Sequence, residues 1–264
     1  MRNPFGVRGR YEVRSQHAGP IEFFIYDVIG DDPFGGGISA RKFVQDLAEA
    51  DDADIVVRIN SPGGLVHDGI AMMNAMRTHS GHVTAQVDGV AASAAAFLVQ
   101  GAQERIMQPD TSMMIHRAWG LTIGNQTDHR KAAEDLAHFD SQIAGIMASR
   151  SGTSVDDVLA AMDAETWYGA PEALAAGLID GVGDSAAIAN QWDLSQYANT
   201  PDRLLQVEQR DAVPSKRDTE KALRDAGFSR TAARAVVSGG WNAAVADPDL
   251  ESLRDTLNAL NQGS

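Results

Sequence analysis

Cysteine is absent from the sequence, and basic residues are few. Without a thiol the chain can form neither disulfides nor thiolate metal sites, and a nucleophile must be a hydroxyl, amine or carboxylate. The 22 lysines and arginines stand against 36 aspartates and glutamates, and a net charge of -14 disfavours binding to nucleic acid or an anionic membrane surface. No stretch approaches the ~20 apolar residues that a membrane helix requires. These absences exclude thiol hydrolases.

Apolar residues are nevertheless sufficient for one substantial core. The chain has 264 residues, of which 44% are apolar, and this predicts one main domain. Its composition divides it into a polar lead (1–20), the main domain (21–186), a polar linker (187–214) and a helical tail (215–264). Because the first residues contain no apolar stretch like that of a secretory signal, we expect a cytoplasmic protein.

Strand-like and helix-like segments alternate along the main domain. Short runs of apolar and β-branched residues predict strands at 21–29, 54–60, 83–88 and 112–115. Helical spacing of apolar residues predicts helices after Ser39 and over 69–79, 93–101, 127–150 and 154–162. Such alternation predicts an α/β fold with a largely parallel sheet.

A serine and a glycine turn both follow predicted strands. The turn INSPGG (59–64) would expose backbone N–H groups, which can hold an anion or a developing oxyanion, although most such turns are only turns. Ser93 stands between the strand at 83–88 and a helix of small residues. Its hydroxyl would lie at a helix N-terminus, where the dipole favours an alkoxide-like state, or it would merely cap that helix.

Among the seven histidines, His116 directly follows an apolar strand-like segment, SMMI. A histidine at the end of a strand can be held rigidly enough to act as a general base. Taken singly it would more often be structural. Taken together with Ser93 and a carboxylate, it predicts nucleophilic catalysis by a serine.

Five blocks of the sequence resemble the proteolytic subunit of the Clp protease, whose fold superfamily includes the crotonases. The blocks are INSPGG, GVAASAAAFL, MMIHRAWG, a long helix, and ETWYGAPEALAAGLID, and the similarity as a whole runs from about residue 21 to 183. The resemblance implies a Clp-protease-like α/β fold of repeated β-β-α and βαβ units with a long handle helix, followed here by a small helical appendage. It also implies a serine endopeptidase with Ser93 as nucleophile, His116 as base, and the Gly64 and Ala94 amides as oxyanion donors.

The third catalytic position departs from the family pattern. The family has an aspartate where Glu165 stands in this sequence, just before the block that contains Trp167 and Pro171. A glutamate can accept the imidazole N–H, but its extra methylene demands a small backbone adjustment. Asp163 is therefore the competing candidate, but we place Glu165 ahead of it, because the block that follows fixes the register.

The chain beyond the resemblance bears on its partners. The tail from Ser215 to Trp241 is similar to tails of Clp-like proteases encoded by tailed phages, which implies a prohead protease acting on scaffold or capsid protein in the host cytoplasm or the prohead. The family's handle helix implies a ring-shaped homo-oligomer. Docking to an unfoldase stays open, because nothing before residue 20 resembles the family's axial loops. Basic residues make the tail locally positive, but no nucleic-acid motif accompanies them.

Other functions stay open alongside endopeptidase chemistry. The same fold supports acyl-CoA chemistry of the crotonase type, which uses oxyanion amides but no serine nucleophile. A non-catalytic scaffold or assembly protein is a further alternative. A Ser–Lys dyad lacks a placeable lysine between Lys42 and Lys131. No metal or other cofactor is expected, because no HExxH-type spacing is present.

Overall fold

The structure is a computed structural model that describes residues 9–15, 19–31, 37–185, 187–188 and 191–205. The chain divides into two units between Glu208 and Gln209, and every described residue belongs to the first. The helical tail predicted for 215–264 therefore lies outside the described residues.

Eight strands in the described part of the chain form one sheet, with the order β1-β2-β3-β4-β5-β8; β6 also pairs with β4, and β7 pairs with β6. The strands are β1 (Arg10–Arg14), β2 (Ile21–Tyr26), β3 (Ile55–Ser61), β4 (Val83–Ala92), β5 (Glu104–Met107), β6 (Ser112–Ile115), β7 (Thr166–Gly169) and β8 (Gly181–Val182). β2 through β5 pair in parallel, as do β4 with β6 and β5 with β8. Only the β1–β2 and β6–β7 pairs are antiparallel among these strands. The predicted α/β class is confirmed.

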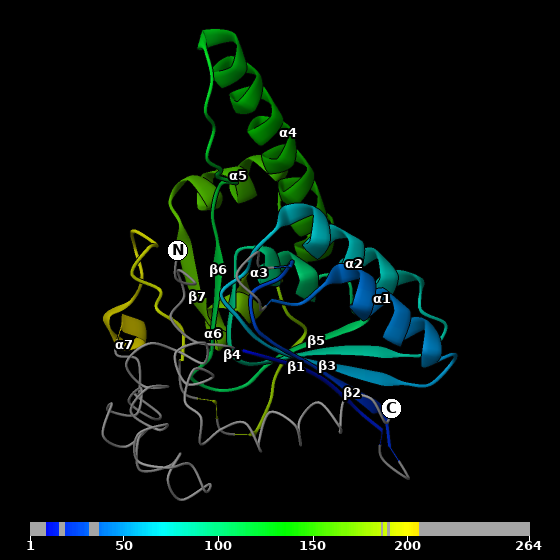
Figure 1. Ribbon diagram of the computed structural model, residues 1–264. Helices are drawn as coiled ribbons and strands as arrows, with labels where there is room; N and C mark the ends of the chain where they lie inside the picture. Colours follow the sequence, from blue (N-terminus) through cyan, green and yellow to red (C-terminus); the bar gives the residue numbers. More distant parts are fainter. Residues whose placement is uncertain (1–8, 16–18, 32–36, 186, 189–190, 206–264) are drawn as a thin grey trace, which may run out of the picture. The chain divides into compact units, whose positions relative to one another are not determined.

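Three helices cover one face of the sheet: α1 (Ala40–Glu49), α2 (Val66–Thr78) and α3 (Ala94–Val99) (Figure 1). Each presents an apolar face to the strands, and Phe43, Met72 and Leu98 are completely buried there. Every residue of α3 is buried, which explains why its sequence is so rich in alanine. This layer packs α3 firmly at the end of β4.

The long helix α4 (Gln126–Ser151) begins and ends at well-defined caps. The Asn125 side chain accepts hydrogen bonds from the first turn, Asp128 completes the capping box, and Gly152 adopts the left-handed conformation at φ 75°. Its first half is mostly exposed and projects away from the sheet, whereas residues such as Met147 in its second half join the core (Figure 1). α5 (Val155–Asp163) and α6 (Ala170–Ala175) follow. None of the described helices is long and apolar enough to cross a membrane.

Four of the eight strands, β1, β5, β7 and β8, were not predicted from the sequence, and β4 is longer than predicted. β1 lies within the polar lead but pairs with β2, so the packed unit begins before residue 21. β5 contains Arg105, whose buried guanidinium is neutralised by the Asp180 carboxylate. Because a charged residue interrupts the apolar pattern of a buried strand, β5 was not predicted. β4 continues through the small residues after Asp88 as far as Ala92 and so leads directly into Ser93.

The sequence predicts a linker over 187–214, and the structure differs over the part that it describes. Residues 191–205, which we name the strap, pack on the second face of the sheet and end in the short helix α7 (Asp202–Leu205). Alternation along β4 and β6 exposes a second set of side chains on this face. The resulting cluster contains Val90, Ala92, Met114, Trp192, Leu194, Tyr197 and Leu204. Polar composition misled the prediction because four large apolar residues suffice to bury the strap.

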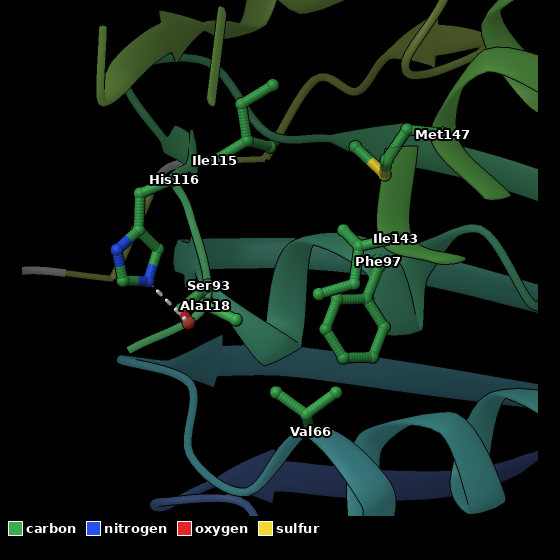
Figure 2. A pocket seen from close by; sticks show the side chains of 8 residues that line it. All are labelled: Val66, Ser93, Phe97, Ile115, His116, Ala118, Ile143 and Met147. Atoms are coloured by element: carbon green, nitrogen blue, oxygen red, sulfur yellow. Dashed lines mark hydrogen bonds between the residues drawn. The ribbon is translucent and has the colours of Figure 1, made fainter. Parts of the chain in front are cut away.

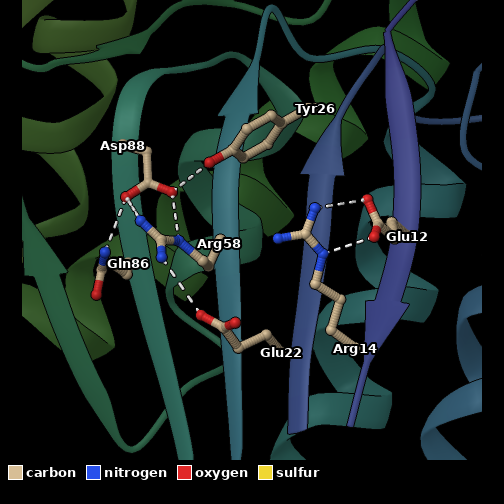
Figure 3. A network of polar contacts seen from close by, with 7 residues as sticks. All are labelled: Glu12, Arg14, Glu22, Tyr26, Arg58, Gln86 and Asp88. Atoms are coloured by element: carbon tan, nitrogen blue, oxygen red, sulfur yellow. Dashed lines mark hydrogen bonds and ion pairs between the residues drawn. The ribbon is translucent and has the colours of Figure 1, made fainter. Parts of the chain in front are cut away.

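A polar network lies on this second sheet face at Asp88, outside the strap cluster (Figure 3). The Asp88 carboxylate accepts two hydrogen bonds from the Arg58 guanidinium, at 2.8 and 3.0 Å, and one from the Tyr26 hydroxyl at 2.5 Å. Glu22 and Gln86 complete the network. Because the Asp88 side chain is almost fully buried, this network satisfies a charge that would otherwise be costly.

Candidate active site

Ser93 occupies a strained turn between β4 and α3. Its backbone lies at φ 53° and ψ -119°, a region that non-glycine residues rarely adopt. The amide of Ser93 donates to the Met114 carbonyl at 2.9 Å, which ties the turn to β6. The hydroxyl makes no capping bond with α3. The simple N-cap interpretation of Ser93 therefore does not describe this structure.

His116 faces this hydroxyl from the end of the neighbouring strand. Its Nε2 lies 2.8 Å from Ser93 Oγ (Figure 2). When the ring proton resides on Nδ1, Nε2 accepts the hydrogen bond from the hydroxyl, which is the arrangement of a general base. Among the described residues, Ser93 provides the one hydrogen bond made by this imidazole.

Burial lowers the pKa of His116, while the negative charges of Glu165 and Asp140 act in the opposite direction and raise it. The net result is a pKa below the ordinary histidine value, so the imidazole is neutral near pH 7. A neutral imidazole can accept a proton. The electrostatic environment therefore suits the role that the sequence predicts.

Glu165 lies close enough to influence His116 but is not hydrogen bonded to it. Its backbone is at φ 47°, and its carboxylate accepts hydrogen bonds from the amides of Ala198 at 2.9 Å and Asn199 at 2.6 Å. Trp167 Nε1 is a further donor at 3.4 Å. The carboxylate is thus fixed by the strap.

The competing acid, Asp163, points elsewhere. Both of its oxygens pair with the Arg117 guanidinium at 2.7 Å, and its side chain is 62% exposed. Asp140 of α4, which sequence reasoning missed, receives the Ala118 amide at 2.7 Å and adds a second negative charge near His116. Its position 24 residues beyond His116, on a helix, carried no sequence signal for this proximity.

The glycine turn lies directly against Ser93. A Cβ atom on Gly63, at φ 101°, would approach Ser93 Cβ to 2.7 Å and the Ala94 nitrogen to 3.0 Å. A Cβ on Gly64 would collide with the Ile29 carbonyl oxygen at 2.0 Å. In the described part of the chain, the amides of Gly64 and Ala94 donate to no protein acceptor. The Ala94 amide directly follows Ser93, and the Gly64 amide follows the glycine that packs against it, so both are candidate donors for an oxyanion.

An apolar pocket opens beside the serine and histidine (Figure 2). It has a volume of about 310 Å³ including its open mouth. Apart from Ser93 and His116, its lining consists of Val66, Phe97, Ile115, Ala118, Ile143 and Met147. None of the described residues that line the pocket carries a charged side chain that could pair with a charged ligand group, apart from His116 when it is protonated.

Tyr197 is a site residue that sequence reasoning missed. Its ring lies edge-on to the His116 imidazole, with centroids 5.3 Å apart and planes at 80°. The available signal was the pair Trp192 and Tyr197, two large aromatic residues in an otherwise polar run. In the described residues no group of three histidine, aspartate or glutamate side chains is arranged to hold a metal ion.

Comparison with known proteins agrees with this geometry. Residues 39–186, more than half of the chain, match the family model of the Clp protease. The chain is 33% identical over 137 residues to an ATP-dependent Clp protease proteolytic subunit of Pleurastrum terricola, covering 51% of this chain and 70% of that protein. It is 37% identical over 131 residues to the subunit of the same name from Bacteroides fragilis, covering 49% and 63%. It is 31% identical over 159 residues to the ATP-dependent Clp protease proteolytic subunit 3 of Streptomyces avermitilis, covering 60% of this chain and 72% of that protein.

Proposed function

Because the chain belongs to the Clp protease family, a family of peptidases, we propose that it is a serine endopeptidase acting through an acyl-enzyme. The 2.8 Å contact between Ser93 Oγ and His116 Nε2 carries this proposal. Acyl-CoA chemistry would not need that contact, and a purely structural subunit would have no use for a strained serine beside free amides.

The proposed reaction begins with proton transfer. His116 Nε2 takes the proton of Ser93 as Oγ attacks the substrate carbonyl carbon, and the oxyanion receives the amides of Gly64 and Ala94. The protonated imidazole then gives its proton to the leaving amine, and the C–N bond breaks. Water, deprotonated by His116, attacks the resulting ester and releases the acid and the free serine.

Glu165 is the third member in this proposal, ahead of Asp163. Its negative charge stabilises the imidazolium that forms during both steps, and it does so from a position fixed by the strap amides. The carboxylate of Asp163 is neutralised by Arg117, so it offers little field at His116. Asp140 adds to the effect of Glu165 from α4.

The apolar pocket supports a preference for substrates with an apolar side chain next to the cleaved bond. A charged side chain would lose its hydration there without gaining a partner, since the lining holds only apolar groups besides Ser93 and His116. Two helices, α3 and α4, meet at this pocket and contribute Phe97 and Met147 to its lining.

Assembly into a homo-oligomeric ring is part of the proposal and comes from the family resemblance. The loop that leads into α4 exposes large apolar side chains that a second copy could cover: Trp119 is 69% exposed, Leu121 90% and Ile123 90%. Rings would enclose the active sites.

Processing of scaffold or capsid protein during phage head maturation is the proposed biological role. It rests on the similarity of the tail at 215–241 to tails of phage-encoded Clp-like proteases. Ordered assembly would confine proteolysis to the inside of the prohead. The prohead itself would assemble in the host cytoplasm.

Peptide hydrolysis tests the proposal. Fluorogenic peptides with leucine, lysine or aspartate before the cleaved bond are incubated with the wild-type protein, with Ser93→Ala and with the surface control Ser141→Ala. We expect cleavage after leucine by the wild type and the control, and none by Ser93→Ala. Equal cleavage by Ser93→Ala, or turnover of an acyl-CoA thioester in place of peptides, would contradict the proposal.

A further inference from the structure

The strap (191–205) contacts the candidate active site although it lies beyond residue 186, where the match to the family ends. Its path therefore cannot be explained by the part of the fold that the chain shares with the family. Figure 1 shows its yellow trace beside β7, whose Trp167 packs against the strap cluster.

Both halves of the strap are anchored to the sheet. Trp192 is completely buried, and its Nε1 donates to the Asn60 side-chain oxygen at 3.3 Å. At the other end, Arg203 Nη1 donates to Ser112 Oγ at 2.8 Å, and Leu204 is buried in the strap cluster. These anchors hold the segment between them in one position.

That middle segment reaches three parts of the site. The Tyr197 ring packs on the His116 imidazole, and its hydroxyl donates to the Pro62 carbonyl at 2.7 Å, in the glycine turn. The amides of Ala198 and Asn199 hold the Glu165 carboxylate. The Asn199 side chain also donates to the Ala164 carbonyl at 2.8 Å, which braces the strained backbone before Glu165.

We propose that the strap completes the active site, with Tyr197 and Asn199 as positioning residues that act through His116 and Glu165. This inference rests on the proposed peptidase function. The imidazole has no hydrogen bond besides that to Ser93 among the described residues, and the Tyr197 ring, packed edge-on against it, adds a second restriction on its rotation. Fixing a base to within a fraction of an ångström is a recognised source of rate.

Tyr197 also keeps water from the imidazole, because its ring is buried against it. The groups that face His116 are Ser93, the carboxylates of Glu165 and Asp140, and Tyr197. Removing the ring would rehydrate the imidazole and move its pKa up toward the ordinary value. A loss of stability elsewhere in the fold would not cause that movement.

The test measures the rate of fluorophosphonate labelling as a function of pH on the full chain, with the folded fraction determined in parallel. Four variants are compared: Tyr197→Leu, Tyr197→Phe, Asn199→Ala and the control Tyr26→Leu. Tyr26 matches Tyr197 in burial, 8% against 7% exposed, and in its phenol hydrogen bond, but it lies in the Asp88 network.

We expect Tyr197→Leu to slow labelling by about 10- to 100-fold and to raise the midpoint of the acidic limb. Tyr197→Phe keeps the ring and should keep the wild-type midpoint. Asn199→Ala should slow labelling without moving the midpoint upward, because it loosens Glu165 alone. Tyr26→Leu should match the wild-type labelling rate per folded molecule.

If Tyr197→Leu does not fold, Tyr197→Phe and Asn199→Ala still test the proposal. Labelling of Asn199→Ala at the wild-type rate would overturn it.

Two further results would overturn the inference. In the first, Tyr197→Leu is labelled as fast as the wild type with the same midpoint, which would mean that the strap plays no part in the site. In the second, Tyr197→Leu is labelled faster than the wild type, which would mean that the strap only blocks access to Ser93. Failure of the proposed function is distinguishable, because the wild type would then not be labelled at all. The His116 pKa, followed by NMR with ¹³C-labelled histidine, would in that case still test the contact: an unchanged value in Tyr197→Leu contradicts it, and a raised value supports it.

Discussion

Ala92 of β4 and Met114 of β6 are register partners, and this pairing brings Ser93 and His116 together. Ser93 comes one residue after Ala92, and His116 comes two residues after Met114. Because parallel strands end at the same edge of a sheet, both side chains reach that edge at one point. The distance between the proposed nucleophile and base is thus a property of sheet register.

Gly63→Ala should abolish most of the activity. The added Cβ would meet Ser93 Cβ at 2.7 Å, so the turn or the serine must move, and we expect labelling by a fluorophosphonate to fall by about 10²-fold. Gly152→Ala is the matched control: its φ is also positive, at 75°, but nothing lies within 4 Å of the added atom. It should lose about 1 kcal/mol of stability in urea and keep the wild-type rate. Equal effects of both substitutions on the rate would refute this account of the turn.

The pH dependence of peptide hydrolysis should follow His116. Burial lowers its pKa, so the acidic limb of kcat/KM should have its midpoint below about 6.5, the ordinary histidine value. The Asp140 charge raises this pKa, and Asp140→Asn, which removes the charge but keeps an acceptor for the Ala118 amide, should move the midpoint further down. A midpoint above the ordinary value, or an upward shift in Asp140→Asn, would be inconsistent with these charges.

The two candidate acids can be separated by paired substitutions. Glu165→Gln removes the charge that favours the imidazolium, and we expect kcat to fall about 10- to 100-fold, less than in a triad whose acid is directly hydrogen bonded to the base. Asp163→Asn breaks an exposed ion pair with Arg117 and should leave kcat unchanged. A large loss in Asp163→Asn with none in Glu165→Gln would reverse the assignment.

The Asp88 network should determine stability and not activity. Asp88→Ala would leave the Arg58 guanidinium without its main partner on a mostly buried sheet face, and we expect a loss of about 3 kcal/mol in urea unfolding (Figure 3). The labelling rate per folded molecule should not change. A change in that rate would mean that the second sheet face is coupled to the site in a way that the contacts do not show.

Much of the fold could be predicted from local signals. α4 extends one residue beyond each predicted end, because Asn125 and Gly152 provide strong caps. Four strands were not predicted: β1, β5, β7 and β8 are all short, and β1 and β5 also carry charged residues. Burial of Arg105 in β5 depends on Asp180, which is far away in sequence.

Some residues of the candidate site could likewise be predicted from local signals, and others could not. Ser93, His116 and the glycine turn could be predicted because each stands at the end of a strand or in a recognisable motif. Asp140 and Tyr197 could not, because their proximity to His116 arises from the packing of α4 and the strap and leaves no pattern in sequence spacing. The polar composition of the strap led us to predict a linker there.

Location of a covalent label by mass spectrometry tests the central claim most directly. The wild-type protein, Ser93→Ala, His116→Ala and the exposed-histidine control His82→Ala are treated with a fluorophosphonate, and the modified residue is identified by peptide sequencing. The account predicts one adduct, on Ser93, in the wild type and in His82→Ala, and none in the other two proteins. A folded wild type that stays unlabelled, or an adduct on a different serine, would contradict it.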